Sequence, residues 1–163
     1  MIQWMKKRWK ENKGFTLVEL IIVIAILAIL VGLLAPQYVK YVEKSRKSTD
    51  VSNLESLVEG VKIAAADTDY NIAVGTYKIT MTSNETTIAD ETTPATGSLT
   101  TIQTALKEYT GKDFSNGTCS TLKLKSNRWG DSGISATIEI KSTGSVTVTY
   151  SPSDIETTID KNS

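Results

Sequence analysis

The chain carries one long apolar run near its start, from Phe15 to Ala35, and an alternating pattern after it. The run has 21 residues, and a helix needs about 20 predominantly apolar residues to span a bilayer core. Only Thr16 and Glu19 within it are clearly polar. The pattern therefore predicts a membrane helix over residues 15–36.

A helical stripe of apolar residues follows the run. Its members are spaced i, i+3, i+7, i+10 and i+14, as in one face of a helix that packs on a core: Val51, Leu54, Val58, Val61 and Ala65. We expect one helix from Phe15 to about Ala66, with residues 37–66 as its amphipathic half. Gly32 and Pro36 predict a kink in it, because proline removes a backbone donor and glycine weakens a helix.

The remaining residues, 67–163, predict a small globular head that begins with a stretch of loop over 67–98. Tyr77, Ile79 and Met81 alternate with polar residues and predict a short strand within this stretch, while its Thr-rich part from Asn84 to Gly97 reads as exposed loop.

Helical spacing then predicts a short helix at about 100–110, ended by Gly111. Thr100 and Gln103 fit a capping box at its start.

The last third of the chain predicts an antiparallel sheet at about 120–150, because apolar and polar residues alternate in three segments. The segments run from Leu122 to Leu124, from Ile134 to Ile140 and from Val146 to Tyr150. A C-terminal tail, Ser151–Ser163, has only Ile155 and Ile159 as anchors and is expected on the surface. The predicted fold class is α+β, with a long N-terminal helix packed on a small antiparallel sheet.

Charge is unevenly distributed although the formal net charge is zero. Residues 1–14 carry a net charge of +4 and the remainder carries −4. Basic residues before a membrane span stay cytoplasmic, so the head is expected outside the cell membrane. An acidic body argues against general nucleic-acid binding, which depends on positive charge.

The residues around the start of the apolar run form a recognisable motif. Lys13-Gly14-Phe15-Thr16-Leu17-Val18-Glu19, preceded by a basic leader, resembles the class III signal of type IV prepilins. The resemblance implies that prepilin peptidase cuts between Gly14 and Phe15 and methylates the new amine of Phe15, and that Glu19 is retained. A leader starting at Met5 instead of Met1 keeps every feature. Beyond about Lys40 the resemblance is one of layout, and an ordinary signal anchor is the alternative.

Glu19 is the unusual residue of the span. A carboxylate in a membrane helix costs roughly 2.5–3.5 kcal/mol on insertion scales, and no basic residue lies between Phe15 and Gln37. We therefore expect its partner to come from elsewhere, the methylated amine of Phe15 on a neighbouring copy being one candidate. Such a contact would set the register of a homopolymer, because a heterologous contact repeated along a screw axis builds an open filament.

The resemblance implies a type IV pilin, held in the membrane before assembly and found in an extracellular pilus afterwards, with prepilin peptidase and the assembly machinery as partners. In this family the region corresponding to Gly32 and Pro36 can loosen on assembly. The single cysteine, Cys119, cannot form an internal disulfide, which favours a pilin of Gram-positive type. We expect Cys119 to be a small buried apolar residue.

Chemistry other than assembly finds little support in the sequence. The chain has no histidine, the commonest general base. Asp67, Asp69 and Asn71 resemble the start of a calcium loop, but Ile72 and Lys78 stand where that loop needs glycine and glutamate. We therefore expect no enzyme activity, cofactor or metal. The hypotheses are a shaft pilin, a minor pilin or pseudopilin of a secretion or DNA-uptake machine, and, from another class, a membrane-anchored extracellular enzyme or binding module.

Overall fold

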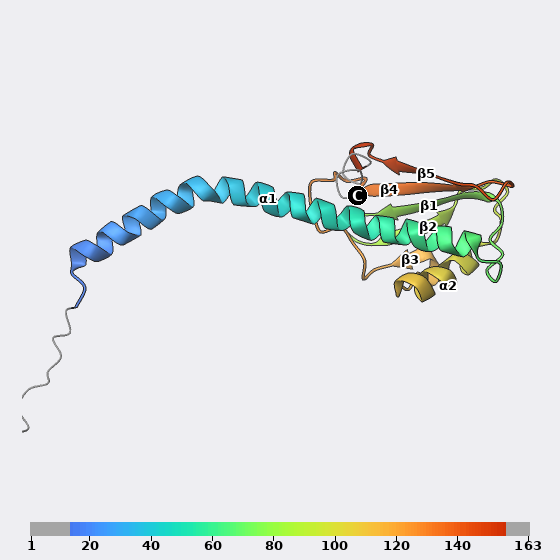
Figure 1. Cartoon of the computed structure of the whole chain (residues 1–163), viewed down its shortest axis with the longest axis horizontal. Helices are drawn as coiled ribbons and strands as arrows, with labels where there is room; N and C mark the ends of the chain where they lie inside the picture. Colours follow the sequence, from blue (N-terminus) through green and yellow to red (C-terminus); the bar gives the residue numbers. More distant parts are fainter. Residues whose placement is uncertain (1–13, 156–163) are drawn as a thin grey trace, which may run out of the picture. The chain divides into compact units, whose positions relative to one another are not determined.

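The computed structural model describes residues 14–155, so the leader with both candidate start residues and the tail from 156 lie outside the described residues. The chain divides into two compact units, Met1–Tyr41 and Val42–Ser163. The helix α1 (Leu17–Ala66) contributes to both, as Figure 1 shows. Each unit is described by itself below.

In the first unit, α1 is apolar on all sides and none of its side chains is buried. By length and composition it is the one helix among the described residues that could cross a membrane. A helix that is apolar all round is stable in water only when something covers it. This part of the chain therefore requires lipid or a protein partner.

The second unit is a five-stranded antiparallel sheet with two helices (Figure 1). The sheet order is β3-β2-β1-β4-β5. The strands are β1 (Gly75–Met81), β2 (Thr86–Asp90), β3 (Thr118–Cys119), β4 (Ile134–Ile140) and β5 (Val146–Ser151). The second helix is α2 (Leu99–Thr110), and a short 3-10 turn, η1 (Ser115–Gly117), follows it. The predicted α+β class is confirmed.

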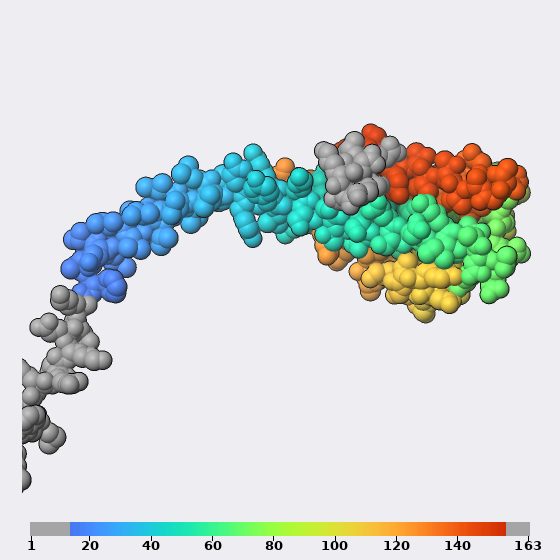
Figure 2. All heavy atoms as spheres, viewed as in Figure 1, coloured from blue at the N-terminus to red at the C-terminus, as the bar shows by residue number. Residues whose placement is uncertain are grey.

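The core lies between one face of the sheet and the helices. In β1 and β4 the buried residues alternate with more exposed ones, so that Tyr77, Ile79 and Ile138 face the core. The predicted stripe of α1 packs there, with four members buried and Ala65 partly buried. Figure 2 shows α2 beside the end of α1. Gly60 is buried at this contact, and a Cβ at this position would lie only 3.0–3.1 Å from the side chains of Thr110 and Leu106.

Several predicted elements were wrong in detail. The stretch from Asn84 to Gly97 contains β2, in which Thr86 is buried because its hydroxyl donates a hydrogen bond to the Leu122 carbonyl at 2.7 Å. Leu122 and Leu124 contribute to the core without forming a strand, and β3 lies just before them.

The proposed capping box of the second helix is also absent. Its N-cap is Ser98, whose side chain makes no cap bond and instead accepts a hydrogen bond from the Ala73 amide at 3.0 Å. The helix ends as expected at Gly111, in the left-handed conformation with φ 69°. Cys119 is buried and free, and Ile155 is fully buried, so the tail is not wholly on the surface at its start.

Candidate functional site: the start of the apolar helix

The proposed cleavage junction is accessible. Gly14, Phe15 and Thr16 precede the first helical residue, and the side chain of Phe15 is 91% exposed. A Cβ built on Gly14 would have no atom within 4 Å. A larger residue at position 14 would therefore meet no obstacle among the described residues, and we expect any effect of such a change to arise in the peptidase.

Thr16 and Glu19 form a reciprocal cap at the start of α1. The carboxylate oxygen Oε2 of Glu19 accepts hydrogen bonds from the Thr16 amide and from its hydroxyl, each at 2.8 Å. The Glu19 amide donates in turn to the Thr16 hydroxyl at 3.2 Å. This is a capping box, which satisfies amides that the first turn of a helix leaves without partners.

The box corrects the expectation that Glu19 must find its partner elsewhere. Thr16, three residues earlier, already supplies two donors to its side chain. Both donors bind the same oxygen, and among the described residues no donor binds Oε1. The carboxylate is therefore satisfied on one oxygen and free on the other. Its proposed register role is not tested by this arrangement.

Gly32 and Pro36 both lie inside α1, which continues through them. A Cβ at Gly32 would have no atom within 4 Å, so packing within the chain does not explain the glycine. The kink at these two residues stays a prediction.

The second unit holds a buried carboxylate that sequence reasoning missed. Asp50 of α1 is fully buried. It accepts hydrogen bonds from the amides of Lys125 and Ser126 at 2.7 and 2.9 Å, and from the indole nitrogen of Trp129 at 3.0 Å. The donors lie 75 to 79 residues further along the chain.

Two further residues of α1 fasten the same loop. Glu43 accepts a hydrogen bond from the Ser126 hydroxyl at 2.9 Å, and the ammonium of Lys47 lies 4.1 Å from the centre of the Trp129 ring. The Ser126 hydrogen bond, with Arg46 nearby, keeps the pKa of the Glu43 carboxyl below its usual value against the effect of partial burial. We call residues 125–129 the clamped loop. It fixes the end of the head nearest in sequence to the apolar helix.

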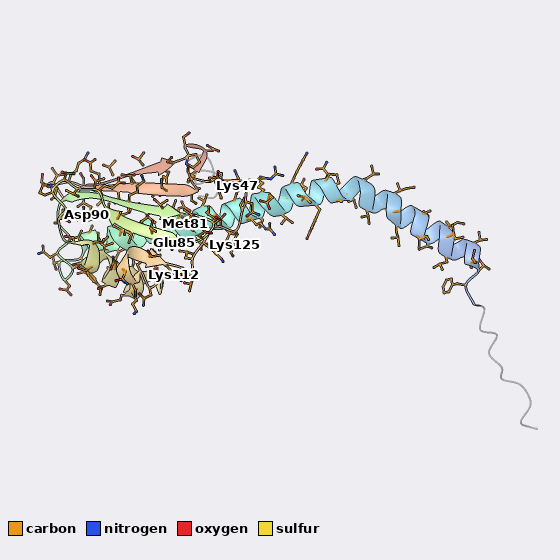
Figure 3. The ribbon with its side chains drawn as sticks, turned by 180° about the vertical axis from the view of Figure 1, so that it is seen from behind. Lys47, Met81, Glu85, Asp90, Lys112 and Lys125 are labelled. Carbon is orange, nitrogen blue, oxygen red and sulfur yellow. The ribbon has the colours of Figure 1, made fainter. Side chains whose placement is uncertain are left out.

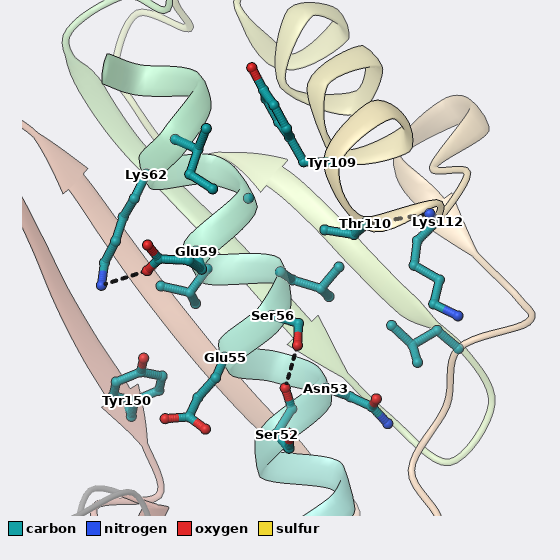
Figure 4. A pocket seen from close by; sticks show the side chains of 15 residues that line it. Ser52, Asn53, Glu55, Ser56, Glu59, Lys62, Tyr109, Thr110, Lys112 and Tyr150 are labelled. Atoms are coloured by element: carbon teal, nitrogen blue, oxygen red, sulfur yellow. Dashed lines mark hydrogen bonds and ion pairs between the residues drawn. The ribbon is translucent and has the colours of Figure 1, made fainter. Parts of the chain in front are cut away.

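An open groove runs along α1 in the second unit (Figure 4). Its polar lining includes Glu55, Glu59 and Lys62 of α1, while Tyr109 and Tyr150 contribute from α2 and β5. Burial raises the pKa of the Glu55 carboxyl, and Lys62 partly offsets this rise. Within the groove the ammonium of Lys62 lies 3.5 Å from the Glu59 carboxylate, and the Ser56 hydroxyl donates a hydrogen bond to the Ser52 carbonyl one turn earlier. Among the described residues no group of three or more metal-ligating side chains occurs.

Comparison with protein families decides what the N-terminal arrangement represents. The model of the prokaryotic N-terminal methylation motif matches residues 9–35. The chain carries the class III signal of a type IV pilin-like prepilin. The match covers the predicted cleavage junction, the predicted methylation residue Phe15, and Glu19 with its capping box, and it ends where the apolar run ends.

The signal implies that the prepilin is processed by prepilin peptidase and assembles into pilus-type filaments, and with the apolar helix it is consistent with membrane anchoring before assembly. No curated protein matches the chain, and no solved structure matches it. The head lies wholly outside the matched motif.

Proposed function

We propose that the chain is the main structural subunit of a type IV pilus, cut between Gly14 and Phe15, methylated at Phe15 and polymerised through its N-terminal helix. The observation that carries this proposal is the methylation motif on an apolar helix whose first turn contains Glu19. The subunit is a substrate of enzymes and not itself an enzyme. Its partners are copies of itself, prepilin peptidase and the assembly machinery, and its final location is an extracellular filament.

Assembly requires that apolar surface move from lipid to protein. Large side chains of the helix, from Leu17 to Leu34, are about half to two thirds exposed. Burying each is worth about 1.5–3 kcal/mol in either environment, so the aliphatic contacts balance between membrane and filament and do not select one alignment. A directional contact is needed to fix the register between copies.

Glu19 is suited to that contact because one of its carboxylate oxygens is free. It lies four residues after Phe15, about 6 Å along a helix axis. A neighbour displaced by about that rise would bring its Phe15 amine to Oε1 while Thr16 keeps Oε2. Removing one partner of a buried ion pair costs about 3–5 kcal/mol, which is enough to disfavour every other register.

The test separates the charge of Glu19 from its capping role. Glutamine serves equally well at this position of a capping box, so Glu19→Gln keeps the cap and removes the charge. We expect Glu19→Gln and Glu19→Ala to give processed, membrane-inserted subunits without filaments, and Glu19→Asp to be partly tolerated. Electron microscopy of strains with one variant as the sole copy, with membrane immunoblots as control, gives the readout. Normal filaments from Glu19→Gln would refute the register role.

A minor pilin or pseudopilin carries the same signal, and abundance distinguishes these from a shaft subunit. A shaft subunit should be the main protein of filaments sheared from the cell surface. A few copies per filament, or filaments that persist when the chain is deleted, would contradict the shaft assignment and leave the prepilin assignment intact.

A further inference from the structure

Basic side chains gather at the end of the second unit that follows the apolar helix in sequence. The clamped loop and the residue pair before it present exposed bases, and α1 presents another beside them. We call these four exposed residues the basic collar: Lys44, Lys123, Lys125 and Arg128. Figure 3 shows Lys47 and Lys125 at the same end of the second unit, as their contacts with Trp129 and Asp50 require.

The collar is held in place by hydrogen bonds that do not use the charged ends of its side chains. Lys125 binds Asp50 through its backbone amide, and the Arg128 amide donates to the Ser126 hydroxyl at 3.2 Å. Neither bond uses the charged end of the side chain. Among the described residues no carboxylate forms an ion pair with any of the four collar residues.

The acidic groups around the collar only partly neutralise it. Asp50 is buried and already bound by three donors. Glu43 is engaged by Arg46 and Ser126 and also attracts the charge of Arg128. Glu85 and Asp131 are the remaining acids on adjoining segments. Elsewhere the described residues of the second unit include ten acids and five bases, so the collar is the positively charged region of an otherwise acidic head.

Only a short segment of the chain separates the first collar residue from the membrane span. Nine residue steps separate Ala35, the last residue of the apolar run, from Lys44. Such a segment is at most about 30 Å long when fully extended and about half that as a helix. In the first unit, Tyr38 and Tyr41 are about 70% exposed, and tyrosines are enriched at the level of lipid headgroups.

We propose that the basic collar binds the headgroups of anionic phospholipids while the subunit is held in the membrane. Each Lys or Arg near an anionic surface is attracted to it, and the attraction fades within a Debye length of about 8–10 Å. The acidic remainder of the head is repelled by the same surface, so the two effects together direct the collar toward the lipid. The contact belongs to the subunit before assembly and goes beyond the filament role proposed above.

Trp129 of the clamped loop is a natural fluorescent probe, because it lies next to the collar residue Arg128 in the sequence. Trp129 is the only tryptophan outside the leader, so Trp4→Phe and Trp9→Phe leave it as the single tryptophan, which can be excited selectively over the tyrosines. The chain is reconstituted in phosphatidylcholine vesicles that contain a small fraction of lipid with a nitroxide on its acyl chain near the headgroup. The labelled lipid is either phosphatidylglycerol or phosphatidylcholine, and Trp129 quenching is compared between the two.

We expect the anionic label to quench Trp129 about twofold more than the neutral label at low ionic strength, and equally in molar salt, where screening is short-ranged. Lys125→Gln with Arg128→Gln should bring the ratio close to one, whereas Lys112→Gln with Lys141→Gln removes the same charge elsewhere and should preserve it. Lys44→Gln with Lys123→Gln tests the collar without altering the clamped loop.

Three outcomes would overturn the proposal. Equal quenching by both labels in the unaltered chain would show no preference for anionic lipid. An equal loss in the Lys112 and Lys141 control would show an effect of net charge alone. A ratio that rises with the amount of protein per vesicle would assign the collar to contacts with a second copy.

Discussion

Replacing Asp50 should destabilise the head more than any exposed acidic substitution. The side chain is fully buried and accepts three hydrogen bonds, two of them from backbone amides of the clamped loop. Asp50→Ala leaves all three donors without an acceptor. Asp50→Asn keeps one oxygen, which can satisfy Ser126 and Trp129, but turns an amide group toward the Lys125 amide, so that two donors face one another.

The magnitude follows from the burial of each donor. A buried donor left unsatisfied costs about 1–3 kcal/mol. The Ser126 amide and the Trp129 indole bonds are buried, whereas the Lys125 bond is partly buried and water can replace part of it. We therefore expect Asp50→Ala to lower the free energy of unfolding by about 3–5 kcal/mol and Asp50→Asn by about 1–3 kcal/mol. A domain has only about 5–15 kcal/mol in total.

The assay is urea unfolding of the full chain in a mild detergent, followed by Trp129 fluorescence with both leader tryptophans replaced by phenylalanine. Asp131→Asn is the matched control, because Asp131 lies two residues after Trp129 in the sequence and is exposed. A loss below about 1 kcal/mol for Asp50→Ala, or one equal to that of the Asp131 control, would refute the view that Asp50 holds the loop.

Three further predictions test processing, autonomy of the head and its acid stability. Gly14→Val should block leader removal without disturbing the chain, and mass spectrometry of the membrane-bound protein checks this; a processed variant would contradict it. A fragment beginning at Glu43 should be soluble and give mixed helix and strand circular dichroism, since residues 17–42 of α1 contribute no core residue. Partial burial raises the pKa of Asp90, but the combined hydrogen bonds from Thr96 and Thr92 outweigh it and lower the pKa to about 2, below the usual value of about 3.9. That stabilisation is complete above about pH 4 and is lost as the pH falls toward 2, so Asp90→Asn should flatten the pH dependence of the unfolding midpoint there; an unchanged slope would count against it.

The parts of the fold that the sequence predicted are those set by local periodicity. The apolar run, the stripe ending near Ala65 and the alternation in β4 and β5 need only the spacing of residues along one element. β2 was missed because its sequence is rich in threonine and lacks a clear apolar face. Thr86 is buried only because it finds the Leu122 carbonyl, 36 residues away, and no local pattern contains that partner.

Asp50 was missed for the same physical reason. In the sequence it ends a charged stretch, and such stretches are usually solvated. Its three donors lie in a loop 75 or more residues further on. Tertiary contacts alone turn this residue from a surface charge into a buried acceptor.

The two capping motifs show when a local signal is sufficient. Thr100 and Gln103 match the pattern, yet α2 begins earlier, because Ser98 and its neighbours are bound to other parts of the head. Thr16 and Glu19 match the same pattern and form the box. Their helix begins in a unit without a packed core, so no tertiary contact competes with the local one. The capping box of Thr16 and Glu19 is therefore predictable from the sequence alone, because the pattern of a capping box is local.

The geometry of Glu19 also distinguishes two ways in which a filament could use it. If the neighbour's amine displaced Thr16, the cap would compete with assembly, and Thr16→Val would promote filament formation. Because both Thr16 donors bind Oε2 and leave Oε1 free, the amine can instead be added to an intact box. Thr16 then holds the carboxylate in the orientation that the neighbour requires, and its loss frees the side chain to adopt other rotamers. A lost cap costs about 0.5–2 kcal/mol, so we expect Thr16→Val to reduce piliation several-fold, while Thr16→Ser remains normal. More filaments from Thr16→Val than from the unaltered chain, counted by electron microscopy at equal subunit levels, would show that the cap opposes assembly.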